Sequence, residues 1–177
     1  MDCIPVSGRR GDLVSGRCSF ISNGFTIEST TDLKEVLTQV HSSTDRDDII
    51  PILDVDSFGK RYLNPDVVKE VRVRGRRLWL ITYIRSVDDI IDAMCGTFDR
   101  LCVPIHTLDH MDVLSEGLEI SDCIVPTIFV HDGKHIGDGD KDDLISAMVH
   151  LGYQEYAIFD IERCTIDHLE SSMAADI

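Results

Sequence analysis

The sequence has no excess of basic residues, no long apolar run and no closely spaced pair of cysteines. Its 17 Lys and Arg face 32 Asp and Glu, so the net charge is −15. This balance excludes a nucleic-acid backbone as partner, because that partner requires a basic surface. No run approaches the roughly 18 apolar residues of a membrane span, and the first residues lack the apolar core of a secretory signal. We therefore expect no nucleic-acid partner and no contact with a membrane.

Six cysteines are present, but none forms a CxxC pair. This spacing argues against a zinc ribbon and against the disulfide framework of a small secreted domain. Reduced thiols in a cytoplasmic protein are the simplest interpretation. The excess of Asp over Glu fits an acidic protein of the archaeal type, adapted to a salty or acidic cytoplasm, and concerns solubility rather than activity.

What the sequence does contain is an ordinary globular composition, with 43% hydrophobic and 28% charged residues in 177. No linker rich in Pro, Gly or Ser divides it, so we expect a single α/β domain over residues 1–177. Short, nearly continuous apolar runs rich in β-branched residues are typical of strands covered on both faces. They lie at 3–6, 49–55, 78–84, 101–105, 124–130 and 156–161.

Stretches with helical spacing separate these runs, at 31–40, 65–73, 86–94, 109–118 and 141–151, and a further short helix is expected at 165–175. Residues 8–23 are predicted to be a long loop. The alternation predicts a parallel sheet of about six β-α units with helices outside, an incomplete TIM-barrel-like fold. Its first and sixth strands would have exposed edges, and we therefore expect a homo-oligomer.

The order of motifs resembles the histidine-biosynthesis barrels, namely the ribotide isomerase that opens a phosphoribosyl ring and its cyclase sister. The resemblance extends over nearly the whole chain. It rests on DCIPVSGRRG (2–11), IPILDVDSFGKRYLN (50–64), WLITYIRSV (79–87), LCVPIHTL (101–108), 125–134 and YAIFDIERCT (156–165). It implies a protein that binds a small phosphorylated metabolite.

The chain departs from this family at the residues that would carry the reaction. Ser7 stands in place of the acid that ends the first strand, His131 in place of the fifth-strand acid, and Cys164 in place of the sixth-strand Asp. Ring opening requires one acid and one base in fixed positions. We therefore expect a diverged relative that lacks the family's own isomerase activity. If the protein is an enzyme, we expect an isomerase or lyase that acts on a phosphorylated, sugar-like substrate. A non-catalytic partner or regulator of a full-length enzyme is the alternative.

A second resemblance concerns VPTIFVHDGKHIGDGD (125–140), which is similar to a segment of glutaredoxins. It suggests a thioredoxin-fold protein without redox cysteines, because Arg85 to Asp88 stand where the reactive pair belongs. A cis bond between Val125 and Pro126 would favour this alternative.

Function in such sheets lies at the carboxyl ends of the strands. Asp54 and His131 are the catalytic candidates; Asp54 would act as a base or ribose ligand, or else would cap the following loop or pair with Arg61. The phosphate-binding candidates are Arg85, Ser86, His106 and Thr107. For Ser86 the competing role is that of a helix N-cap, and for Arg85 an ion pair with Asp88 or Asp89.

We expect no cofactor and no metal. The alternative is the i, i+4 pair His106 and His110, which a helix would place on one face, with His131, His135 and Cys164 as possible neighbours.

Overall fold

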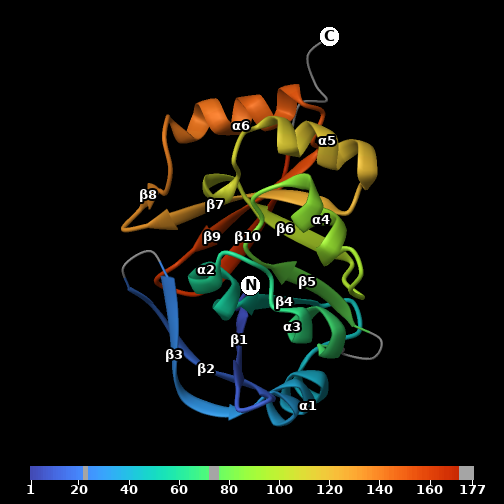
Figure 1. Cartoon of the computed structure of the whole chain (residues 1–177), viewed down its shortest axis with the longest axis vertical. Coiled ribbons are helices and arrows are strands. Elements are labelled where there is room, and N and C mark those ends of the chain that lie inside the picture. The colour runs from blue at the N-terminus through green and yellow to red at the C-terminus, as the bar shows by residue number, and fades with distance from the viewer. Residues whose placement is uncertain (22–23, 72–75, 172–177) are drawn as a thin grey trace.

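The computed structural model describes residues 1–21, 24–71 and 76–171, and places ten strands and seven helices in them (Figure 1). In chain order these are β1 (Ile4–Arg9), β2 (Asp12–Ile21), β3 (Gly24–Asp32), α1 (Leu33–Ser43), β4 (Ile49–Asp54), α2 (Val55–Lys60), α3 (Pro65–Glu70), β5 (Arg77–Ile81), α4 (Val87–Ala93), β6 (Arg100–Pro104), η1 (Ile105–Thr107), α5 (Asp112–Ile120), β7 (Ile124–His131), β8 (Lys134–His135), α6 (Lys141–His150), β9 (Glu155–Asp160) and β10 (Thr165–Glu170).

Six strands run parallel, side by side and in chain order, namely β1, β4, β5, β6, β7 and β9. They correspond to the six apolar runs of the sequence. The central residues of β4, β5, β6 and β7 are buried on both faces, which is why the sequence of these strands is apolar at consecutive positions. The parallel arrangement brings their carboxyl ends to one edge, called the carboxyl edge below.

The predicted fold class is nevertheless wrong. The sheet is mixed, because β2 and β3 continue it antiparallel beyond β1, β10 pairs antiparallel with β9, and β8 pairs antiparallel with β7. It is therefore not a parallel arrangement of six β-α units, and the prediction of an incomplete TIM-barrel-like sheet is corrected accordingly.

Two segments account for this error. Residues 8–23 were predicted to be a loop, but Arg10 and Gly11 have positive φ and turn the chain back from β1 into β2. Residues 165–175 were predicted to be helical, but the described part forms β10, and residues 172–175 lie outside the described residues. Both β2 and β10 are partly buried and mixed in polarity, as expected of strands that are covered on one face only.

The sheet curls so that its ends approach each other. The amide of Ile166 in β10 donates to the carbonyl of Met1 at 2.8 Å, and the amide of Cys3 donates to the carbonyl of Cys164 at 2.9 Å. Consequently β9 is covered by β10, and β1 by β2. The exposed strand edges from which a homo-oligomer was predicted are therefore not present at these two strands.

Each face of the curled sheet has its own core. The outer core lies between the sheet and the helices, and combines Ile52 and Leu80 with Val67, Ile90 and Met148. The inner core lies within the curl, where side chains of β3, α2 and β10 cover the concave face. Its members include Phe25, Leu53, Phe58, Trp79, Phe129, Phe159 and Ile166.

Candidate functional site

The carboxyl edge collects every predicted site residue, because Asp54 ends β4, Arg85 and Ser86 follow β5, His106 and Thr107 follow β6, and His131 ends β7. These four strands are neighbours in the sheet. The candidates nevertheless separate into three groups that differ in burial and in the direction their side chains take.

Asp54 is fully buried and faces the helices. It shares its side of β4 with Ile50 and Ile52, which belong to the outer core. Its Oδ2 accepts hydrogen bonds from the amide of Asn64 at 2.8 Å and from the hydroxyl of Thr82 at 2.9 Å, while Oδ1 has no partner. Burial raises the pKa of the Asp54 carboxyl to about 6. The carboxylate thus caps the loop before α3, as the alternative interpretation had it, and does not point into the curl.

Asp56 connects this buried group to the end of β1. It accepts hydrogen bonds from the hydroxyl of Ser7 at 2.7 Å, from the amide of Gly8 at 2.7 Å and from the side-chain amide of Asn64 at 3.2 Å. Ser7 therefore acts as a hydrogen-bond donor to a neighbouring carboxylate. Sequence reasoning did not assign Asn64 to the site, although the Asn–Pro pair ten residues after Asp54 was a visible signal for it.

Arg85 and Ser86 precede α4. Their backbone amides both donate to Oδ2 of Asp89, at 2.8 and 3.0 Å, so a carboxylate of the protein already satisfies them. The guanidinium of Arg85 is 57% exposed and lies 3.5 Å from Asp109. Ser86 is the N-cap of α4, as the alternative interpretation had it. Arg85 does form an ion pair, but with Asp109 and not with Asp88 or Asp89 as predicted, and only its side chain remains open to a ligand.

The turn after β6 is fastened to the turn that carries Arg85. The hydroxyl of Thr107 lies 2.5 Å from the carbonyl of Ile84 and 2.8 Å from that of Pro104 and shares its one proton between these two acceptors. The amide of Asp109 donates to the carbonyl of Arg85 at 3.0 Å. The structure thus brings the four predicted phosphate-binding residues together on two adjacent turns.

His106 packs inward from the same turn. Its ring lies 4.8 Å from that of Phe129, and Nδ1 is buried without a partner. Burial lowers the pKa of His106 to about 4, so the imidazole is neutral at physiological pH. His106 belongs to η1, whereas His110 lies beyond it before α5, so the two do not share a helix as a metal-binding pair would require.

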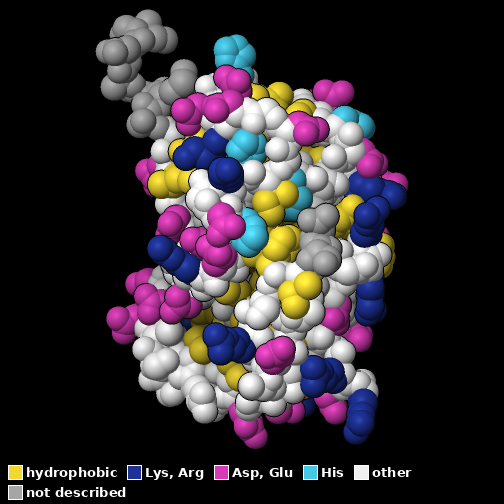
Figure 2. All heavy atoms as spheres, turned by 90° about the vertical axis from the view of Figure 1, so that its left-hand side faces the viewer, with side chains coloured by type: hydrophobic (Ala, Val, Ile, Leu, Met, Phe, Trp, Pro, Cys, Tyr) yellow, Lys and Arg dark blue, Asp and Glu magenta, His cyan; other side chains and the backbone are white. Residues whose placement is uncertain are grey.

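His131 lies at the tip of β7, away from Asp54 and Arg85. Its ring makes an edge-to-face contact with Phe20 of β2 at 5.5 Å. The structure places its nitrogen near the carboxylates of Asp132 and Glu162 instead, the ligand atoms lying within 4.8 Å of one another. Figure 2 shows this side of the molecule, on which imidazoles gather among apolar and acidic side chains. Glu162 was not among the catalytic or phosphate-binding candidates named from the sequence.

Aromatic side chains fill the curl beneath the carboxyl edge. Phe129 lies 5.5 Å from Phe58 and 4.7 Å from Phe159, and Phe25 of β3 contacts all three rings at 5.1 to 6.4 Å. The two catalytic candidates are consequently separated, since Asp54 lies behind the sheet and His131 lies beyond this aromatic packing.

The peptide bond between Val125 and Pro126 is trans, since the described residues include no cis bond. The feature that would have favoured the thioredoxin alternative is therefore not found. Among the helices of the described chain, none is long and apolar enough to cross a membrane.

No protein-family model matches the chain, and a comparison with curated proteins finds no relative. The resemblance to the histidine-biosynthesis barrels therefore stays a prediction, and the site is argued from its own geometry.

Proposed function

We propose that this protein binds a small phosphorylated metabolite at the carboxyl edge without carrying out the ring-opening isomerisation. The observation that carries the proposal is the juxtaposition of the Arg85 and Thr107 turns, which are joined by hydrogen bonds from Thr107 and Asp109. This rigid pair of turns presents one guanidinium, and an arginine side chain can bind a phosphate through two parallel hydrogen bonds.

The ion pair between Arg85 and Asp109 does not prevent such binding. Both side chains are more than half exposed, and an exposed pair of this kind stabilises a protein by at most about 1 kcal/mol. A phosphate dianion carries more charge than Asp109 and can displace it. Since the backbone amides before α4 are already bound to Asp89, we expect a modest affinity that depends on the Arg85 side chain.

The placement of the acids supports the proposal that no isomerisation takes place. Asp54 is 0% exposed and its Oδ2 is bound by Asn64 and Thr82, so a substrate cannot reach it without unpacking the outer core. Acid–base catalysis requires a group within hydrogen-bond distance of the proton that it transfers. Asp54 and His131 cannot both lie within hydrogen-bond distance of one substrate, because Asp54 is buried behind the sheet and His131 lies at the tip of β7.

Ribose 5-phosphate should therefore raise the melting temperature of the protein. At ten times the dissociation constant, binding stabilises the folded state by about 1.4 kcal/mol, which corresponds to roughly 3–5 °C for a domain of this size. Replacing Arg85 with glutamine should weaken binding about tenfold or more, because a charge-assisted hydrogen bond contributes about 1.5–3 kcal/mol. Thermal shift and calorimetric titration measure both effects.

The matched control is Arg46→Gln, which removes an exposed arginine from the loop before β4, at the opposite edge of the sheet. Arg46→Gln should bind ribose 5-phosphate as the natural protein does, and ribose without phosphate should not stabilise either protein. No stabilisation by millimolar ribose 5-phosphate, or equal weakening by the two substitutions, would contradict the proposal.

A further inference from the structure

A histidine and two carboxylates meet where β7 and β9 end. One nitrogen of His131 and one oxygen each of Asp132 and Glu162 all lie within 4.8 Å of one another. His131 is half-buried, and the two acidic side chains are exposed. This set is separate from the Arg85 and Thr107 turns to which we assign phosphate binding.

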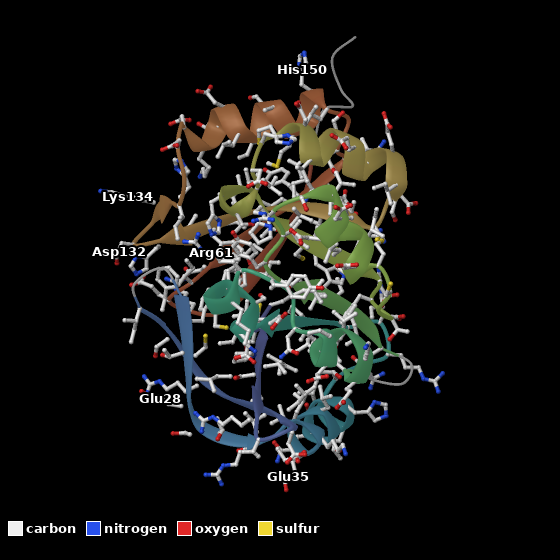
Figure 3. All side chains as sticks on the ribbon, in the orientation of Figure 1. Glu28, Glu35, Arg61, Asp132, Lys134 and His150 are labelled. Carbon is white, nitrogen blue, oxygen red and sulfur yellow. The ribbon has the colours of Figure 1, made fainter. Side chains whose placement is uncertain are left out.

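Two turns with defined geometry hold these residues. Asp132 and Gly133 form the two-residue connection between β7 and β8, and their φ values of 51° and 72° are those of a type I′ turn, in which Asp–Gly is favoured. Figure 3 shows Asp132 and Lys134 at the outer tip of this hairpin, directed away from the body of the molecule. The turn fixes the backbone of Asp132 beside the ring of His131.

The second turn is fixed by Asp160, the last residue of β9. Its Oδ1 accepts the amides of Glu162 and Arg163, both at 3.0 Å, and the amide of Ile161 donates to the carbonyl of Val130 at 3.0 Å. The turn that carries Glu162 is thereby attached directly to β7. These bonds fix the backbone of Glu162 relative to β7, which ends at His131.

Neither Asp132 nor Glu162 forms an ion pair with a described residue, and the nearby Arg163 lies 3.7 Å from Asp160 instead. Two like charges no more than 4.8 Å apart repel by at least about 0.9 kcal/mol even in bulk water. A cation between them would turn this repulsion into attraction.

We propose that His131, Asp132 and Glu162 bind a divalent first-row transition-metal ion, with its remaining positions open to water. The donor set determines the class of ion. An imidazole nitrogen suits transition metals better than Mg²⁺ or Ca²⁺, whereas two carboxylates suit Mn²⁺ and Zn²⁺ better than soft ions such as Cu⁺. Three protein ligands leave room for water or for an oxygen of a substrate.

Mn²⁺ is the appropriate probe, because it binds thiolates poorly and the six cysteines will not compete for it. In 0.5 M NaCl, which suppresses the diffuse attraction of cations to a protein of net charge −15, the signal of free Mn²⁺ in electron paramagnetic resonance should fall by one equivalent per chain. Mg²⁺ in tenfold excess should not restore it.

Glu162→Gln and Asp132→Asn should each weaken Mn²⁺ binding at least tenfold while the fold stays intact, since both side chains are exposed and asparagine accepts the positive φ of residue 132. Glu119→Gln, which makes the same change at an exposed site on α5, is the matched control and should bind as the natural protein does. Far-ultraviolet circular dichroism confirms that each variant is folded.

Failure to bind Mn²⁺ at millimolar concentration would overturn this proposal, and so would equal weakening by Glu162→Gln and Glu119→Gln. Neither result affects the phosphate proposal, whose test uses Arg85 and metal-free buffer.

Discussion

Replacing Phe129 with alanine is expected to lower the free energy of unfolding by about 3–5 kcal/mol. Phe129 is 1% exposed and its ring contacts those of Phe25, Phe58, Phe159 and His106. Those partners come from β3, α2, β9 and η1, so the ring joins elements that are distant in the chain. Removing it loses buried apolar area and leaves a cavity that these rings cannot easily close. Urea denaturation measures the change.

The control for this substitution is Ile91→Ala, on the solvent side of α4, where the side chain is 49% exposed. Its effect should be within about 0.5 kcal/mol, as for most surface substitutions. If Phe129→Ala lost less than 1 kcal/mol, the inner core would not be packed as described, and the claim that aromatic rings fill the curl beneath the carboxyl edge would be wrong.

The sequence predicted the parallel strands well because their cause is local. A strand covered on both faces must be apolar at consecutive positions, and residues 49–55 and 124–130 have this pattern whatever their partners are. The antiparallel strands were missed for the complementary reason. In β2, polar residues alternate with Val14 and Cys18, and this short alternation was mistaken for a loop. In β3, the alternation around Phe25 and Ile27 was too short to be recognised, and no element was predicted there.

The same distinction holds for the candidate site. Arg85, Ser86, His106 and Thr107 lie together because they follow two neighbouring parallel strands, β5 and β6. The alternation of strands and helices along the chain predicts such neighbours well. The direction of the Asp54 side chain could also have been predicted from the sequence. Side chains two residues apart on a strand lie on the same face of the sheet, and Ile50 and Ile52 belong to the outer core.

The approach of Glu162 to His131 could not be predicted in this way. It depends on the hydrogen bonds of Asp160 with the amides of Glu162 and Arg163, and on the turn at Asp132 and Gly133. An Asp–Gly pair between apolar and polar residues is a strong hairpin signal, and it marks the part of this site that was visible in the sequence.

Asp54 and His106 should give the stability of this protein two opposite dependences on pH over the same range. The pKa of Asp54 is raised from 3.8 to about 6 by burial, so the folded state holds that proton more tightly than the unfolded state does. Its contribution to stability is therefore lost as pH rises from about 4 to 6, by about 3 kcal/mol at 1.36 kcal/mol per unit. Burial lowers the pKa of His106 from 6.5 to about 4, so the unfolded state holds that proton more tightly than the folded state does. The contribution of His106 to stability therefore rises with pH over this range, by about 2–3 kcal/mol when the partial exposure of the ring is allowed for.

The two contributions nearly cancel in the natural protein, and single substitutions should reveal each of them. Relative to the natural protein, Asp54→Asn should gain about 3 kcal/mol between pH 4 and 6.5, in addition to a loss at every pH from the altered hydrogen bonds to Asn64 and Thr82. His106→Phe should lose about 2–3 kcal/mol over the same interval, and the double variant should again run parallel to the natural protein. Urea denaturation at pH 4, 5.25 and 6.5 measures these differences. If the stability of both single variants depended on pH as that of the natural protein does, neither Asp54 nor His106 would have the pKa shift that burial gives it. Asp54 would then not be buried among the helices, and its separation from His131 would no longer be supported.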